Sequence, residues 1–481
     1  MANKLKVLIY NWAQFDNAEL LGGGVSVYLK RLIPELVRQG LEIIFLSVSS
    51  DASKRCKIIP SDNCFSAMGV SSYSLVNPNV PYPHGAAFGA DDLVDDQQAL
   101  QVLEKFIVDI RPDVVHFHSI EGIPASALRL KQSFPDIKWW FTAHNYHLVC
   151  QQIQLFQKGR GRNCQDYLNG EACRTCDWQD FDTISTRGLL EHRVPKSKTL
   201  FAGIEKIKRL LPSQRSNRQK TDAPIQTVDH TWLRRAPRQS ADYFFSWRQY
   251  NLETVLEHFD GVLAVSKLQQ ELLSQVGLDS QKVEVLNPPV RDKELDKGII
   301  QSKEISTISY WGYANPSTGL SLFIDALELL VHRYRATQSL SVLIVSDTGR
   351  RFKDRLALLE PHFNQIQIVK RYDQQTMKSL AARVDLAVIA PLWRETYCQV
   401  AAELYFLGVP VLASSTLGFA GEHIRDERFV FESGSETDLV EHLQHLLEQP
   451  NIISEYWRST EQPPLIQAHS KRLISVYGKS S

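Results

Sequence analysis

Short, almost uninterrupted apolar runs recur along both halves of the chain, and helix-like segments separate them. In the first half these runs cover 5–10, 42–48, 113–118, 138–143, 261–265 and 283–286. In the second half they cover 305–311, 341–346, 366–369, 385–390, 409–413 and 428–431. Strands that are apolar on both faces and alternate with helices are typical of parallel sheets covered by helices on both sides. We therefore predict an α/β protein with two Rossmann-like, doubly wound domains that face a cleft.

The same pattern divides the chain of 481 residues. The first domain covers 1–290, the second covers 300–450, and a tail follows over 451–481. A polar, proline-bearing stretch between the two domains predicts a hinge. Residues 151–256 break the rhythm of strands and helices, and they carry three of the seven cysteines, with a fourth, Cys150, directly before them. We predict that this segment is an insertion in the first domain.

Charge and hydropathy narrow the choice of partners and of cellular location. The chain has 54 basic and 54 acidic residues, so no overall field favours nucleic acid. The first apolar run is too short for a signal peptide, and the chain has no stretch of 18 apolar residues. A cytoplasmic protein is expected. The tract 196–220 has eight Lys or Arg and one Glu among apolar residues. It is either a helix on the inner face of a membrane or a solvated segment.

Three glycines, Gly22, Gly23 and Gly24, stand between the first strand and the first helix. Glycines at this place allow backbone amides to approach a phosphate, and the helix dipole favours negative charge. The spacing differs from the Gly-x-Gly-x-x-Gly pattern of dinucleotide-binding oxidoreductases, which disfavours that class.

Two glutamates lie between the strand-like runs 385–390 and 409–413. Glu395 falls on the turn after the first strand, and Glu403 falls about two turns into the following helix. Ligands of open α/β sheets bind at such strand ends. Carboxylates there can accept hydrogen bonds from sugar hydroxyls.

The run that contains both glutamates, RETYCQVAAELYFLGVPVLAS, resembles the signature of the group-1 (family 4) retaining glycosyltransferases, which have the GT-B fold. Other segments resemble the family in the family's order. They are GGGVSVYLKRLIPELVRQG, DVVHFHS, WWFTAHNYH, DGVLAVSKLQQELL, KVEVLNPPV, SYWGYANPSTGLSLFIDALELL and STLGFAGEHI. The resemblance implies an acceptor-side first domain, a nucleotide-sugar-binding second domain and a tail that packs back on the first. It also implies that a hexosyl group moves to an acceptor hydroxyl with retention, in glycan or glycolipid synthesis.

The resemblance also assigns roles to individual residues. Glu403 would hold the ribose hydroxyls and Glu395 the donor sugar, while His144 would support that sugar in the transition state. The diphosphate of a UDP-, GDP- or ADP-sugar would meet the glycine loop and the backbone amides of Thr396 and Tyr397. Glu422 matches a further acidic position of the family. No metal or other cofactor takes part in catalysis in this class, and the acceptor is a glycan or a lipid-linked molecule.

This chain departs from the family at three positions of the donor site. Tyr313 and Thr318 stand where the family has an Arg and a Lys that neutralise the departing diphosphate, and Cys398 replaces a glycine. We still place Tyr313 and Thr318 in the donor site. Arg350, Arg371 and Arg394 are candidates to supply the missing charge, and each is also typical of a solvated surface. Loss of both cations leaves a second interpretation open, a catalytically impaired sugar- or partner-binding protein.

Four histidines, His116, His118, His144 and His147, fall at or just beyond strand ends. Neutral imidazoles there can bind hydroxyls or serve as hydrogen-bonded core groups. We favour His144 for the site and a structural role for His116 and His118.

Four cysteines in the insertion or directly before it, Cys150, Cys164, Cys173 and Cys176, end in a Cys-x-x-Cys pair. This spacing is typical of a tetrahedral structural zinc site. The alternative is four reduced thiols.

Overall fold

The computed structural model describes most of the chain. The described residues are 4–14, 23–49, 55–76, 78, 94–157, 160–165, 169–174, 176, 240–295, 304–334, 336–348, 352–449 and 451–478. Gly22, the basic tract 196–220 and Arg350 lie outside them.

The N-terminal domain is built on a sheet of eight strands in the order β10-β9-β6-β5-β1-β2-β4-β3. All neighbours in it run parallel except β3, which pairs antiparallel with β4. The strands are β1 (Lys6–Tyr10), β2 (Glu42–Ser49), β3 (Lys57–Pro60), β4 (Ser71–Val76), β5 (Val114–Phe117), β6 (Lys138–Ala143), β9 (Gly261–Ala264) and β10 (Val283–Val285).

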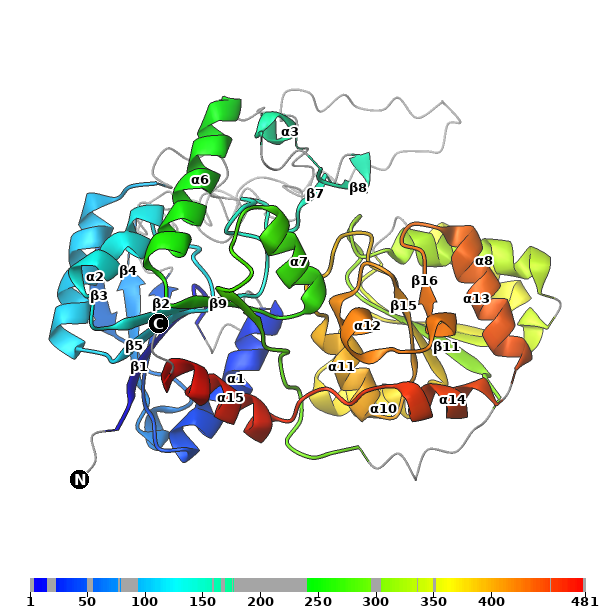
Figure 1. Cartoon of the computed structure of the whole chain (residues 1–481). Helices are drawn as coiled ribbons and strands as arrows, with labels where there is room; N and C mark the ends of the chain where they lie inside the picture. The colour runs from blue at the N-terminus through cyan, green and yellow to red at the C-terminus, as the bar shows by residue number, and fades with distance from the viewer. Residues whose placement is uncertain are drawn as a thin grey trace, which may run out of the picture.

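The C-terminal domain is built on a parallel sheet of six strands in the order β13-β12-β11-β14-β15-β16. The strands are β11 (Thr307–Trp311), β12 (Ser341–Val345), β13 (Gln365–Val369), β14 (Leu386–Ile389), β15 (Val411–Ser414) and β16 (Val430–Phe431). Together with the first sheet, this confirms the two doubly wound, Rossmann-like domains predicted from the sequence (Figure 1).

Helices cover both sheets because each carries an apolar stripe that the sheet faces bury. Those of the N-terminal domain are α1 (Gly23–Arg38), α2 (Gln97–Ile110), α3 (Glu171–Arg174), α6 (Ala241–His258) and α7 (Lys267–Gln275). Those of the C-terminal domain are α8 (Leu320–Arg333), α9 (Lys353–Leu359), α10 (Gln374–Ala381), α11 (Gln399–Phe406), α12 (Gly418–His423), α13 (Glu436–Glu448) and α14 (Ile452–Ser459). A small hairpin of β7 (Phe156–Gln157) and β8 (Arg162–Asn163) stands in the segment predicted as an insertion.

The chain passes between the domains twice. After β10 it crosses to the C-terminal domain, and after α14 it returns to form the last helix, α15 (Ile466–Gly478). The two crossings meet, because the backbone N–H of Ile466 donates to the carbonyl of Arg291 at 2.9 Å. Helix α15 lies beside α1 and buries Leu473, Val476 and Tyr477 in the same core as the N-terminal strands (Figure 1).

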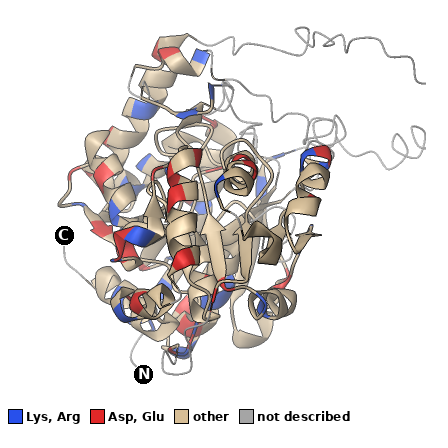
Figure 2. Cartoon of the chain, turned by 90° about the vertical axis from the view of Figure 1, so that its right-hand side faces the viewer, with Lys and Arg blue, Asp and Glu red and all other residues tan. Residues whose placement is uncertain are grey.

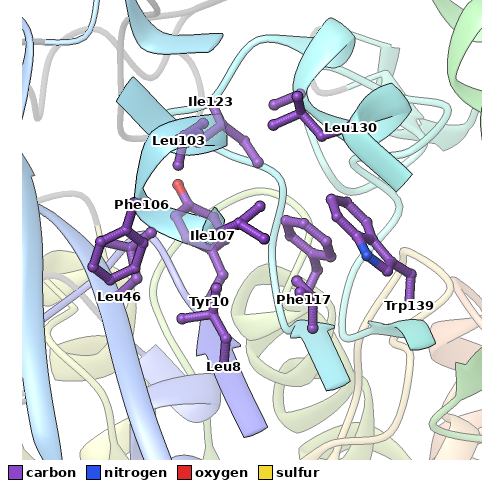
Figure 3. A pocket seen from close by; sticks show the side chains of 12 residues that line it. Leu8, Tyr10, Leu46, Leu103, Phe106, Ile107, Phe117, Ile123, Leu130 and Trp139 are labelled. Atoms are coloured by element: carbon purple, nitrogen blue, oxygen red, sulfur yellow. The ribbon is translucent and has the colours of Figure 1, made fainter. Parts of the chain in front are cut away.

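Figure 3 shows in close view a small apolar cavity in the core of the N-terminal domain. Its lining includes Leu8, Phe106, Phe117 and Trp139 from β1, α2, β5 and β6. Such a dry, narrow space between strands and covering helices belongs to the packing of the core and is far too small for a sugar nucleotide.

The outside of the described part carries both signs of charge. Figure 2 shows Lys and Arg interspersed with Asp and Glu on the helices in that view, without a face of one sign. Among the described helices, none has the length and apolar character needed to cross a lipid bilayer.

Candidate active site between the two domains

The turn from Leu392 to Cys398 carries Glu395 and inserts into the N-terminal domain. Trp393 is buried in the N-terminal core, with its ring centroid 6.3 Å from that of Tyr146 in an edge-to-face arrangement. The side-chain amide of Asn163 donates to the Leu392 carbonyl at 3.0 Å. The loop that follows β14 is therefore held by residues of the other domain.

Thr396 is the centre of this contact and is buried. Its hydroxyl donates to the carbonyl of His144 at 2.8 Å, and its own carbonyl accepts from the Ser266 hydroxyl at 2.6 Å. Gly418 allows this approach, because a Cβ there would lie 2.2 Å from the Thr396 carbonyl oxygen. The predicted donor-site turn and the predicted site histidine are thus directly connected.

The N-termini of α1 and α11 meet across the domain boundary. The side-chain amide of Gln399 donates to the carbonyl of Gly24 at 2.8 Å. Gly23, with a φ of 53°, and Gly24 begin α1, and Gln399 begins α11. The first N–H groups of a helix have no partner within it, and they carry a partial positive charge. Two such ends side by side make a favourable place for an anion such as a diphosphate.

Further along the same two helices, Arg31 of α1 forms an ion pair with Glu403 of α11. The Nη2–Oε1 distance is 2.5 Å, and the side chains are only 17% and 12% exposed. The second terminal nitrogen of Arg31, Nη1, is buried and has no hydrogen-bond partner among the described residues. Glu403, the residue predicted to bind the ribose, therefore has one carboxylate oxygen bound by Arg31 of the other domain. The Nη1 group of Arg31 can still donate a hydrogen bond to a ligand.

Glu395 lies in a partly buried place near two other titratable groups. Burial raises the pKa of its carboxyl to about 7. The pKa values of Tyr146 and Cys398 are raised chiefly by the burial of these side chains, and the charge of Glu395 raises them further. Glu403 raises the Cys398 pKa as well, so the two glutamates flank this thiol. The carboxyl of Glu395 changes its protonation state near neutral pH.

Cys398 occupies the N-cap of α11 with a φ of 77°. This left-handed conformation favours glycine, and it costs a residue with a Cβ roughly 1–2 kcal/mol. The left-handed backbone explains why the family resemblance implies a glycine at this position. This chain has the left-handed conformation with a strained cysteine instead.

The four predicted histidines separate into different environments. His144 is partly buried beside the turn described above, and its ring lies 5.1 Å from that of Tyr28. His116 is fully buried between the hydroxyls of Tyr477 and Thr142, each at 2.7 Å. His118 bonds to His144, and His147 is buried against Trp247. His144 is the predicted histidine that lies beside the predicted donor-site turn.

The loop between β11 and α8 carries the two residues that replace the family cations. Tyr313 is 75% exposed, and the hydroxyl of Thr318 donates to the Tyr313 carbonyl. The side chain of Asn315 closes the same loop by accepting from the N–H groups of Ser317 and Thr318 at 3.0 and 3.1 Å. The Thr318 hydroxyl is therefore committed within its loop, whereas the Tyr313 side chain projects outward.

The candidate replacement cations have different positions. Arg371 is exposed, and Arg394 is partly buried next to Glu395, where its charge lowers the raised pKa of Tyr146. Arg31, which the sequence did not single out, touches Glu403 directly. No local motif marks Arg31, because its partner is 372 positions away and only the packing of two helices joins them.

Two further predicted residues have structural partners. Tyr397 is buried, and its hydroxyl pairs with Nε2 of His423 at 2.9 Å, so only its backbone is available to a ligand. Glu422 accepts from the backbone N–H of Lys267 at 2.5 Å, at the first turn of α7. A carboxylate at a helix N-terminus is stabilising, and here it joins the two domains.

The four cysteines of the predicted zinc site do not form one in the described part of the chain. No group of three or more His, Cys, Asp or Glu residues is arranged there to hold a metal ion. Cys173 accepts from the buried guanidinium of Arg248 at 2.6 Å, and Cys176 accepts from the Gln152 amide at 2.9 Å. Burial raises the pKa of Cys150 to about 11. These residues do not fit the zinc prediction, and Cys164 packs in the apolar core instead.

Comparisons with known proteins agree with this arrangement. Residues 22–178 match the model of glycosyltransferase family 4, and residues 305–449 match that of glycosyl transferases group 1. No curated protein sequence matches the chain.

Solved structures of the same fold match almost the whole chain. A glycosyltransferase from Rickettsia africae is 14% identical, with 99% of this chain and 98% of that one covered and a TM-score of 0.56. Sucrose-phosphate synthase from Thermosynechococcus elongatus is 13% identical, with 98% of this chain and 95% of that one covered and a TM-score of 0.55. An E. coli structure described as trehalose-6-phosphate bound with UDP-2-fluoro glucose is 11% identical, with 99% of each chain covered and a TM-score of 0.54. At such identities the likeness shows the fold. With both family models matched, the chain belongs to the group-1, family 4 glycosyltransferases.

Proposed function

We propose that this glycosyltransferase moves a hexosyl group from a nucleotide sugar to an acceptor hydroxyl with retention of anomeric configuration. The observation that carries the proposal is the meeting of the two domains at one place. Glu395, Glu403 and the start of α11 come from the C-terminal domain, and Gly24, Arg31 and His144 come from the N-terminal domain. Carboxylates, a cation and two helix N-termini are the groups that a ribose, a sugar and a diphosphate require.

Each residue has a chemical task in this proposal. The free oxygen of Glu403 accepts from the ribose hydroxyls, and Glu395 accepts from hydroxyls of the donor sugar. The diphosphate lies at the paired starts of α1 and α11, near the backbone of Gly23, Gly24 and Thr396. Arg31 supports the donor from the N-terminal domain. No metal takes part in the reaction.

The acceptor is a glycan or a lipid-linked molecule that approaches from the N-terminal domain. The protein acts in the cytoplasm, at the inner face of a membrane when the acceptor is lipid-linked. The tract 196–220 would then supply basic residues for anionic lipid. Because the E. coli structure holds UDP-2-fluoro glucose, UDP-sugars are the first donors to examine.

The test is a thermal-shift screen of UDP-, GDP- and ADP-sugars, followed by product analysis with the donor that binds. We expect one nucleotide to raise the melting temperature, and we expect Glu403→Ala to abolish that rise. A rise that persists in Glu403→Ala would refute the placement of the ribose. Binding without transfer or hydrolysis would favour the second candidate, a binding protein that lost its catalytic cations at Tyr313 and Thr318.

A further inference from the structure

His118 and His144 share one hydrogen bond whose direction has chemical consequences. Nδ1 of His118 lies 3.0 Å from Nε2 of His144, and the two rings are stacked with centroids 5.3 Å apart. Both rings follow neighbouring parallel strands, β5 and β6, so the sheet fixes their relative positions. One of the two nitrogens must carry the proton and the other must accept it.

Both rings are neutral at ordinary pH, and their surroundings explain why. Burial lowers the pKa of His118 well below its usual value and that of His144 to about 3. The groups around the pair come from other elements: Tyr28 of α1, His116 of β5, and His469 of α15. The pKa values of His116 and His469 are also lowered by burial. Tyr28 is a neutral phenol at ordinary pH, and burial raises its pKa further. No ionised group among these neighbours would hold a charged imidazole in place.

The far nitrogen of His118 decides between the two directions. Nε2 of His118 is buried and has no hydrogen-bond partner in the described part of the chain. A neutral imidazole carries one proton. If His144 donated, the His118 proton would sit on Nε2 as a buried N–H without a partner. If His118 donates from Nδ1, its Nε2 carries a lone pair instead, and orphaned acceptors are tolerated better than orphaned donors.

We propose that His118 is a positioning residue that donates from Nδ1 to Nε2 of His144 and so fixes His144 as the Nδ1–H tautomer. The inference deepens the proposed function and rests on it. His144 then presents an N–H donor to the donor sugar and offers no lone pair at its free nitrogen. It can bind a hydroxyl oxygen of the sugar, and it does not act as the base that removes the acceptor proton.

The surrounding aromatic residues keep this arrangement rigid. The Tyr28 hydroxyl pairs with Nε2 of His469 at 2.8 Å, and Nδ1 of His469 faces the carbonyl of Asn287 at 2.9 Å. The Tyr28 ring lies 5.6 Å from His118 and 5.1 Å from His144. Helix α15, far away in sequence, thereby supports the ring pair through Tyr28.

The test uses histidine-selective 15N labelling of the full chain, with His144 assigned by its loss in His144→Gln. Long-range 1H–15N spectra should show a protonated Nδ1 on His144 from pH 6 to 8. His118→Leu should abolish this preference, whereas His118→Asn, whose amide can donate from a similar place, should retain it. The matched control is His116→Leu, which removes a neighbouring buried histidine of β5 that bonds to Tyr477 and Thr142 and not to His144. It should leave the tautomer unchanged.

Kinetics give a second and separate readout. With the donor identified in the nucleotide screen, His118→Leu should lower kcat by about tenfold, the rate equivalent of one lost hydrogen bond, with less change in the donor KM. The His118→Asn variant should keep most of the wild-type kcat. A wild-type His144 protonated on Nε2 would overturn the inference, and so would a tautomer that His118→Leu leaves unchanged. The expected spectra together with no transfer from any nucleotide sugar would instead refute the proposed function.

Discussion

The ion pair between Arg31 and Glu403 provides a sharp test of the proposed donor site. Replacing Glu403 by Gln keeps the shape of the side chain and removes its charge. Breaking a fully buried pair costs about 3–5 kcal/mol, and an exposed pair contributes at most about 1 kcal/mol. The side chains of this pair are 17% and 12% exposed, so the pair falls between those limits. We therefore expect Glu403→Gln to lower the free energy of unfolding by about 2 kcal/mol.

The effect on donor binding follows from the same geometry. A hydrogen bond from a ribose hydroxyl to an ionised carboxylate contributes about 1.5–3 kcal/mol, so Glu403→Gln should weaken nucleotide binding by about 10- to 100-fold. Arg31 holds one carboxylate oxygen and orients the other. Arg31→Ala should therefore weaken binding as well, by about tenfold, rather than release Glu403 for the ligand.

Calorimetric titration of the two single variants, the double variant and the wild type with a UDP-sugar measures the coupling. Because both residues act on the same ligand, the double variant should lose less than the sum of the singles. Arg38→Ala is the matched control, since this arginine of α1 pairs with Glu35 within the N-terminal domain and is 63% exposed. Tighter binding by Arg31→Ala would refute the reasoning, because it would show that the ion pair competes with the nucleotide.

Four further predictions concern the titration of Glu395, the close contact at Gly418 and the cysteine cluster. If Glu395 binds the sugar as a carboxylate, its pKa of about 7 makes transfer rise about tenfold from pH 6 to pH 8, and Glu395→Gln should be slow with a flat profile. The raised pKa also means that stability falls as pH rises from the ordinary carboxyl value to about 7, and denaturant titrations of Glu395→Gln should lack that fall. Gly418→Ala should lower stability by about 2 kcal/mol, because its Cβ would lie 2.2 Å from a carbonyl oxygen, whereas Gly421→Ala on the same helix has open space and should be neutral or slightly stabilising. Since Arg248 donates to Cys173, a strong chelator should leave the melting temperature unchanged; a drop of several degrees, accompanied by released zinc, would contradict this.

The regular part of the fold was accessible from the sequence because parallel strands buried on both faces need long apolar runs. Twelve such runs correspond to strands of the two sheets. The strands β3 and β4 escaped prediction. Three of the six residues of β4 are serines, and β3 is a short edge strand with an exposed lysine, so neither forms a continuous apolar run. They close one edge of the sheet, and Figure 1 shows them on the side away from the C-terminal domain.

The positions of two candidate site residues were accessible from the sequence because each follows a strand. His144 comes directly after β6, and Glu395 lies on the turn after β14. Parallel topology brings such positions to the carboxyl edge of their own sheet. Arg31, Gln399 and Ser266 were not predictable, because each meets its partner only through the packing of one domain on the other. The zinc prediction rested on spacing alone. The cysteine spacing does not reveal a buried arginine 75 positions away that bonds to one of the thiols.

The distribution of charge has a consequence for how the donor is held. The family resemblance places two cations on the C-terminal domain, where Tyr313 and Thr318 stand in this chain. The cation that touches Glu403 here comes instead from the N-terminal domain. If the donor binds as proposed, a nucleotide sugar on the C-terminal domain alone would lack the support of Arg31, and we expect full affinity only with both domains in place. The bonds of Thr396 and Gln399 across the boundary hold the domains in the position where Arg31 and Glu403 meet. Donor binding and domain contact should therefore strengthen each other, because both depend on the same few residues.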